Sequence, residues 1–329
     1  MAKIVLGIGT SHSPLLNSPA EDYARHAEVD ASGRKLIDKN GVERSFAELV
    51  ALADPAIHDQ LRLEVLEARA ARCDSNINRL AEIIAQAKLD TLIVIGDDQK
   101  EQYDEDNLPA VLVYWGDTIA NELSDVPETA PAFWRKARSQ YHEQDQARAY
   151  PVDSKLARYL IDNLMDRDFD VAQSKRLGKP RGEGHAFGFV HKRLMGERVV
   201  PIVPVALNTY YPPNQPRPAR CYALGQAIRE AVSTFPGEAR VGILASGGLS
   251  HFAVDEELDH LILRAMIEHD GNALKRIPTT KLNSGSSEIR NWITVAGATE
   301  HLTASWHDYV PCYRSPAGTG CGMGFIALS

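Results

Sequence analysis

Five short runs rich in valine and isoleucine constrain the fold of this chain more than any other feature of its sequence. These runs are apolar nearly throughout, as expected of strands that are covered on both faces of a sheet. Between them, apolar residues recur at helical intervals with charged residues on the other side. The predicted strands are residues 3–9, 91–96, 110–114, 199–206 and 240–245, and the predicted helices lie within 59–88, 153–165, 218–234, 255–270 and 287–299.

This alternation of strands and helices predicts an α/β protein, with three α/β/α layers around a mostly parallel, mixed sheet. The chain has 329 residues, of which 44% are hydrophobic, so we expect residues 1–329 to form one large domain. Two polar segments, near 17–57 and 117–150, carry few periodic hydrophobic residues. They are predicted to be loop-rich insertions with short helices over the edge of the sheet, where such segments often cover active sites.

The composition argues against several classes of partner. The net charge is −8 and no basic stripe is present, which argues against a nucleic-acid partner. No apolar run reaches the roughly 18 residues of a membrane span, and the first residues lack a signal peptide, so we expect a cytoplasmic protein. The four cysteines include no C-x-x-C pair; free buried thiols are expected rather than disulfides or structural zinc.

Polar residues follow three of the predicted strands. The strings are TSH at 10–12, DDQ at 97–99 and SGGLSH at 246–251. Ligands of open α/β sheets bind beyond the carboxyl ends of the strands. If these three strands are neighbours in the sheet, their polar residues converge on one site.

Histidines are the most informative members of these strings. His12 and His251 each follow a strand, and His58 lies at the start of a predicted helix. His185 and His191 lie in the glycine-rich string GEGHAFGFVHKRL, where the backbone can approach a ligand closely. A single histidine of this kind is more often structural, but several raise the prospect of a metal site.

The spacing of these histidines favours one type of metal site. The compact H-E-x-x-H pattern of hydrolytic zinc sites is absent. Dispersed ligands suit two histidines and one carboxylate, the arrangement of non-haem Fe(II) enzymes that activate O2. Glu288, in NSGSSEIRNW, is a candidate carboxylate, although locally it also fits a helix-capping acid.

Taken together, the motifs resemble a known family. The strings GTSHSPLL, DPAIHDQL, GHAFG, LNTYYPPNQP, SGGLSH and SSEIRNW occur in this order and resemble the class III extradiol ring-cleavage dioxygenases. That family includes the catalytic (beta) subunit of protocatechuate 4,5-dioxygenase and the gallate and 3-O-methylgallate dioxygenases. The resemblance extends from about residue 5 to residue 325.

The resemblance implies a non-haem Fe(II) enzyme that opens the ring of a catechol-type aromatic acid from lignin breakdown with O2, and it implies a homodimer. The usual D-H-G turn of the family reads G-H-A at 184–186 here. Position by position, it implies iron ligands at His12, His58 and Glu288, a catalytic base at His251, a second active-site histidine at His185, and substrate contacts at Tyr313 and Ser315.

Two other functions stay open on sequence alone. One is a non-catalytic binding or scaffold protein on the same fold. The other is a hydrolase built on Ser246 or Ser250, although neither lies in a G-x-S-x-G string. A substrate carboxylate would need a cation; the candidates, each more often a solvated surface charge, are Lys100, Arg181, Lys192 and Arg314.

Overall fold

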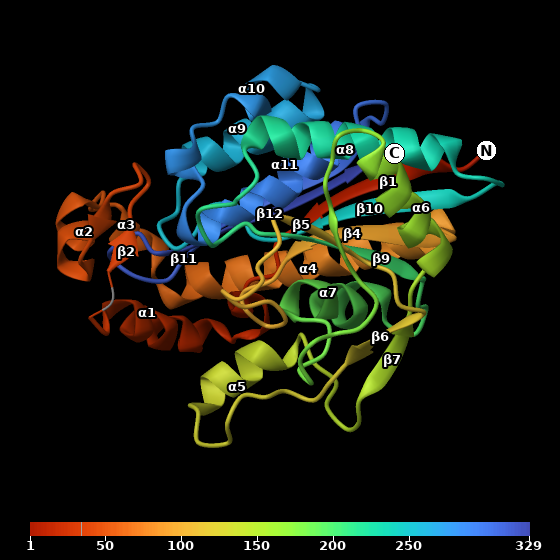
Figure 1. The fold of residues 1–329 in the computed structure, drawn as a ribbon. Helices are drawn as coiled ribbons and strands as arrows, with labels where there is room; N and C mark the ends of the chain where they lie inside the picture. Colours follow the sequence, from red (N-terminus) through yellow and green to blue (C-terminus); the bar gives the residue numbers. More distant parts are fainter. Residues whose placement is uncertain (34) are drawn as a thin grey trace.

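The computed structural model describes residues 1–33 and 35–329. Its central feature is a sheet of eight strands, with helices on both faces (Figure 1). This arrangement confirms the predicted three-layer α/β/α fold. The strands are β1 (Lys3–Thr10), β4 (Thr91–Asp97), β5 (Val111–Tyr114), β8 (Ala172–Ser174), β9 (Ile202–Leu207), β10 (Arg240–Ser246), β11 (Ala304–Tyr313) and β12 (Gly320–Leu328).

The order of the strands is β11-β12-β1-β10-β4-β9-β5-β8. The interior pairs β1–β10, β10–β4 and β4–β9 are parallel, whereas β12 runs antiparallel to β1 and β11, and β5 antiparallel to β9. The sheet is therefore mixed. Because β1, β10 and β4 are neighbours, their carboxyl ends meet at one edge and bring the three polar strings together.

Two helical layers cover the sheet (Figure 1). Side chains alternate between the faces of a strand, so Ile93 and Ile95 of β4 pack into one layer while Leu92 and Val94 pack into the other. The first layer contains α6 (Ser154–Met165), α8 (Pro218–Thr234), α9 (Glu256–Ile267), α10 (Gly271–Lys275) and α11 (Ile289–Ala298), and the second contains α4 (Leu63–Ala87), α7 (His185–Phe189) and the π-helical turn Val190–Met195.

The two polar segments form short helices and two-stranded sheets around this frame (Figure 1). The second contains β6 (Thr118–Asn121), α5 (Ala132–Ser139) and β7 (Arg148–Pro151). The first is anchored partly by a small hydrophobic cluster that includes Leu36, Leu49 and Ala317. Its elements are α1 (Tyr23–Ala31), β2 (Leu36–Ile37), β3 (Glu43–Arg44), α2 (Phe46–Leu52) and the start of α3 (Ile57–Gln60).

Some strands differ from the sequence prediction. The expected strand at 199–206 begins only at Ile202, because Pro201 has no N–H to donate to a ladder. β11 and β12 were not predicted, since β12 is interrupted by glycines and β11 contains Pro311. In the described part of the chain, the four cysteines are free and buried, as expected, and no helix is long and apolar enough to cross a membrane.

Candidate active site

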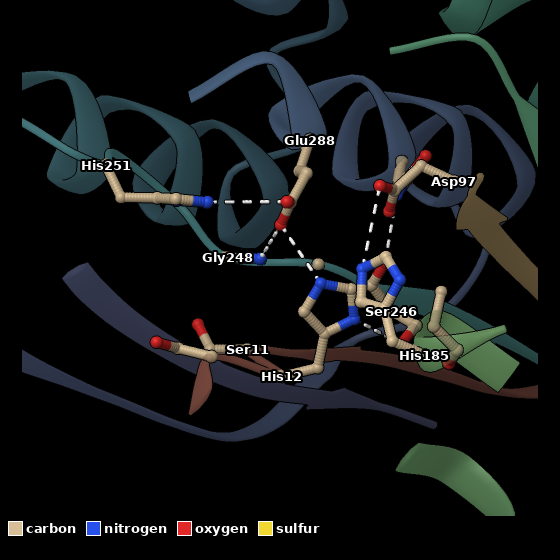
Figure 2. A network of polar contacts seen from close by, with 12 residues as sticks. Ser11, His12, Asp97, His185, Ser246, Gly248, His251 and Glu288 are labelled. Atoms are coloured by element: carbon tan, nitrogen blue, oxygen red, sulfur yellow. Dashed lines mark hydrogen bonds and ion pairs between the residues drawn. The ribbon is translucent and has the colours of Figure 1, made fainter. Parts of the chain in front are cut away.

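A cavity of about 220 Å³ lies at the carboxyl ends of β1, β10 and β4. His12 follows β1 and His251 follows β10, and both line the cavity. Asp97 ends β4, and Gln99, two residues later, lines the cavity. His185 is the first residue of α7, and Glu288 ends the 3-10 turn that leads into α11. Figure 2 shows all five side chains pointing toward one another from these separate elements.

Glu288 is the central group of the cluster. Figure 2 shows its carboxylate between two imidazoles, with Oε2 3.2 Å from Nε2 of His12 and Oε1 3.3 Å from Nε2 of His251. The N–H of Gly248 also donates to Oε2 at 2.6 Å. Burial by itself raises the pKa of Glu288, but the imidazoles of His251 and His12 outweigh burial and hold the pKa well below its ordinary value. The side chain makes no capping bond to α11, so the local alternative of a helix cap does not apply.

The hydrogen bonds of His12 determine which ring nitrogen carries a proton. The hydroxyl of Ser246 donates to the carbonyl of Ala186 at 2.7 Å and has no second proton to give. The Nδ1 of His12, 3.0 Å from the same hydroxyl, is therefore the donor in that contact. Burial is the main reason that the pKa of His12 is lowered, and Glu288 opposes this effect. Nε2 is the ring nitrogen that faces the Glu288 carboxylate.

His185 is held by a different carboxylate. Glu101 accepts from both the backbone N–H of His185, at 3.0 Å, and its Nδ1, at 2.7 Å. Burial alone would lower the pKa of His185, but Glu101 outweighs it and raises the pKa to about 9. Gly184, with φ of 80°, precedes the histidine, and a Cβ there would lie 2.7 Å from Glu101. The Nε2 of His185 lies 3.8 Å from Asp97.

Four of these side chains form a group with the geometry of a metal site. His12, Asp97, His185 and Glu288 are all buried, and each offers one ligand atom within 4.8 Å of the others. Burial, followed by repulsion from Glu288, raises the pKa of Asp97 to about 8. Asp97 lies in the string DDQ, which was predicted to face the site, but it was not among the predicted ligands. Its position at the end of β4 was the available signal.

His251 lies at the more open side of the group. Its Nδ1 donates to the carbonyl of Leu249 at 2.9 Å, which leaves Nε2 toward Glu288. The side chain is 15% exposed, compared with 4% for His12. Burial alone lowers the pKa of His251, but Glu288 and then Cys321 outweigh burial and raise it well above its ordinary value. Because Nδ1 is engaged with Leu249, Nε2 is the atom at which this histidine gains or loses a proton inside the cavity.

The structure does not bring His58 to this group. His58 lies on α3, with an exposed side chain, and does not line the cavity. The predicted helix start is present, but the face of α3 that carries the imidazole points to solvent. A ligand role for His58 thus stays a prediction, because in this arrangement His58 does not contact the other proposed ligands.

The two predicted substrate contacts lie outside the cavity lining as well. The hydroxyl of Tyr313 donates to Glu256 at 2.7 Å, and that of Ser315 is 2.6 Å from the hydroxyl of Thr319. Arg314, between them in sequence, does line the cavity. Roles for Tyr313 and Ser315 stay predictions.

Neither serine of the hydrolase alternative is available as a nucleophile. Ser246 is fully buried and connects His12 to Ala186, as described above. Ser250 is fully buried too, and its hydroxyl donates to Asp259 at 2.7 Å. These contacts give both hydroxyls structural roles and argue against a serine hydrolase.

Further lining residues come from both polar segments, in which the sequence singled out no individual residue, and from two other parts of the chain. Trp134 and Arg138 of α5 both line the cavity, together with His26, Tyr210 and Phe252. Residues four apart share one face of a helix, so the spacing of Trp134 and Arg138 was a usable signal. The predicted His185, by contrast, lies in the cavity lining where the sequence placed it.

The sequence of the chain is similar to those of known proteins. A family model described as "Catalytic LigB subunit of aromatic ring-opening dioxygenase" matches residues 49–320. The chain is 37% identical over 102 residues to the 2,3-dihydroxyphenylpropionate/2,3-dihydroxicinnamic acid 1,2-dioxygenase of Comamonas testosteroni, a match that covers 30% of each chain. It is 35% identical over 98 residues to the gallate dioxygenase of Pseudomonas putida, covering 29% of this chain and 28% of that protein. The matched segments thus span less than a third of either relative.

Proposed function

The chain belongs to the family of catalytic LigB subunits of aromatic ring-opening dioxygenases, and from this premise we propose that it is a non-haem Fe(II)-dependent extradiol dioxygenase. Its proposed substrate is a catechol-type aromatic acid, such as gallate, 3-O-methylgallate or protocatechuate, which it opens with O2. The two relatives above are named for dihydroxyphenylpropionate and gallate, both of which are acids of this type. The observation that carries the proposal is the buried group of four potential ligands within 4.8 Å.

The donor set of this group fits a divalent iron ion. Nε2 of His12 and the Glu288 carboxylate face each other at 3.2 Å, so the two groups can share a proton or bind one metal ion. Imidazole nitrogen and carboxylate oxygen are the ligands of the two-histidine, one-carboxylate iron sites. When bound, Fe(II) supplies a place where both phenolic oxygens and O2 bind side by side, which removes most of the entropic cost of their meeting.

His12 and Glu288 are the proposed ligands that the geometry supports, and the family resemblance adds His58. The structure offers His185 as the alternative second imidazole, because its ring centroid lies 4.6 Å from that of His12. The variants His58→Ala and His185→Ala distinguish the two possibilities by iron content after anaerobic loading with Fe(II). His307→Ala, on the exposed edge strand β11, is the matched control and should keep its iron.

His251 is the proposed base. A phenol has a pKa of ~10, so a catechol arrives protonated at neutral pH and must lose a proton to become a chelating ligand. The Nδ1 of His251 is engaged with Leu249, so Nε2 is the atom that takes the proton. A cation on Glu288 would cancel part of the charge that raises the pKa of His251, and would lower that pKa toward the neutral range that a base requires.

An oxygen-consumption screen tests the proposed reaction. Protein loaded anaerobically with Fe(II) is mixed with O2 and gallate, 3-O-methylgallate, protocatechuate or 2,3-dihydroxyphenylpropionate. With at least one catechol, the protein should consume one O2 for each substrate molecule and give a ring-opened product that carries both atoms of labelled O2. Iron far below one atom per chain, with no uptake on any catechol, would instead favour a non-catalytic binding or scaffold protein.

Two further proposals go beyond the reaction. One is a homodimer, which the resemblance implies and which light scattering of the purified protein measures directly. The other is the cytoplasmic location expected from the sequence, which fractionation of the source cells would check.

A further inference from the structure

The cations in the cavity differ in how fully they are paired. Within the described residues, two guanidinium groups line the cavity, those of Arg138 and Arg314. Arg314 donates from Nε at 2.7 Å and from Nη2 at 2.8 Å to the two carboxylate oxygens of Asp30. Its side chain is only 9% exposed. This bidentate pair uses the planar fork of Arg314, so its charge is already matched inside the protein.

Arg138 is paired much more weakly. The nearest carboxylate is that of Glu101, with 3.9 Å between Nη2 and Oε1, beyond hydrogen-bond distance. That carboxylate already accepts two hydrogen bonds from His185. The described part of the chain offers no hydrogen-bond acceptor to the guanidinium of Arg138, whose other close neighbour is the ring of Tyr141, 5.4 Å from Cζ. The guanidinium has five N–H donors, and in the described part of the chain they have no hydrogen-bond acceptor.

The position of Arg138 relates it to the histidines of the proposed metal site. Tyr141 contacts both: its ring centroid is 5.4 Å from Cζ of Arg138 and 5.7 Å from the ring centroid of His185, and its hydroxyl donates to the carbonyl of His12 at 2.6 Å. The carboxylate of Glu101 also lies close to both Arg138 and His185. Trp134, one turn earlier on α5, lines the same cavity and offers a flat surface to an aromatic ligand.

The other candidate cations do not reach the cavity. Their side chains pair elsewhere and are absent from its described lining. Lys192 lies 2.7 Å from Glu143 and Lys100 2.6 Å from Glu105. Arg181, about half exposed, lies 3.5 Å from a carboxylate on the surface.

From these contacts we infer that Arg138 binds the carboxylate of the substrate acid, while the two phenolic oxygens face the histidines and Glu288. The inference rests on the proposed function, because it assumes that a catechol ring occupies this cavity. The guanidinium fork matches a planar carboxylate in shape and charge. Arg138 would then make the protein select aromatic acids over neutral catechols of the same size.

A matched pair of ligands tests the inference. We would measure the dissociation constants of 3,4-dihydroxybenzoate and its neutral isostere 3,4-dihydroxybenzamide by calorimetry under anaerobic conditions. A hydrogen-bonded ion pair of this kind corresponds to a preference of about 10- to 100-fold for the acid. Arg138→Gln should bring the preference close to one by weakening the acid alone, and Arg138→Lys should keep part of it.

Arg135→Gln is the control variant. Arg135 lies on the same helix, but its side chain is exposed and its Nε donates to the carbonyl of Ala130 at 3.2 Å. This variant should keep the full preference for the acid, and circular dichroism should show that all variants are folded. A wild-type protein that binds acid and amide equally, or binds neither, would overturn the inference, as would an unchanged preference in folded Arg138→Gln.

Oxygen uptake separates this inference from the proposed reaction. If Arg138 sets the preference for the acid but no catechol consumes O2, then the proposed function fails and the carboxylate site stands. If catechols are cleaved and Arg138→Gln keeps the wild-type preference, the dioxygenase stands and the assignment of Arg138 fails.

Discussion

The substitution Ser246→Ala tests whether the environment of His12 prepares it to hold a metal ion. Ser246 accepts from Nδ1 of His12 at 3.0 Å and donates to the carbonyl of Ala186 at 2.7 Å. Both histidine and serine are buried. Loss of the hydroxyl therefore leaves an imidazole N–H and a carbonyl without partners, and frees the ring to rotate or change tautomer.

The expected losses of metal affinity and of folding stability follow from these two contacts. Loss of a hydrogen bond that orients a metal-ligating histidine costs about 10- to 100-fold in metal affinity, or about 1.4–2.8 kcal/mol. Each unpartnered buried group costs about 1–3 kcal/mol of folding stability. We expect Ser246→Ala to be about 2–4 kcal/mol less stable without metal, taking partial relaxation into account, and to bind Fe(II) at least about 10-fold more weakly.

The assay combines anaerobic Fe(II) titration against a competing chelator with urea unfolding of the metal-free protein. Ser11→Ala is the matched control, because Ser11 is buried one residue before His12 and its hydroxyl bonds to the backbone of β12, accepting from Gly324 N–H at 3.0 Å and donating to the carbonyl of Gly322 at 3.4 Å. The control should lose stability without losing metal affinity. Equal Fe(II) affinity in folded Ser246→Ala and wild type would refute the argument that this hydroxyl orients His12 for a metal.

Three further predictions test the base, the packing and the electrostatics. His251→Phe should keep its iron but lower kcat by about 10²- to 10⁴-fold; steady-state oxygen uptake checks this, and an unchanged kcat removes His251 from the mechanism. In Gly9→Ala, the new Cβ would lie 2.3 Å from the ring of Trp292, so the free energy of unfolding should fall by about 1–3 kcal/mol and the urea midpoint should fall with it; an unaltered midpoint contradicts so close a contact. Burial, assisted by Arg314, lowers the pKa of His26 to about 4, below the ~6.5 of an unfolded chain. The unfolded state therefore binds the extra proton, and stability should fall by up to about 3 kcal/mol as the pH drops from about 6.5 to 4; unfolding curves of His26→Asn should lack this dependence.

The strands and helices were largely predictable because their signals are local. The apolar run that became β1 and the helical spacing that became α4 each reflect the periodicity of one element. Glycine and proline weaken such a signal, which is why β11 and β12 were missed although they complete one edge of the sheet. The family resemblance, carried by strings at strand ends and turns, was confirmed by the match over residues 49–320.

The composition of the site depended on contacts between distant parts of the chain. The sequence by itself determined that His12 and His251 follow strands and that Glu288 precedes a helix. It could not show that Glu288 lies between the two imidazoles. That contact exists because β1, β10 and β4 pair as neighbours, an arrangement set by packing over hundreds of residues. Asp97 joined the group for the same reason.

Side-chain direction was the other property that only the tertiary structure decided. His58 lies on a short helix that begins at the end of the first polar segment, and Arg138 lies on a short helix within the second. Both carry a functional group suited to the site. The face that each helix turns inward is set by its packing against the rest of the protein, and that packing leaves His58 exposed while Arg138 lines the cavity. Local sequence specifies a helix and its periodicity, whereas its orientation is a property of the whole fold.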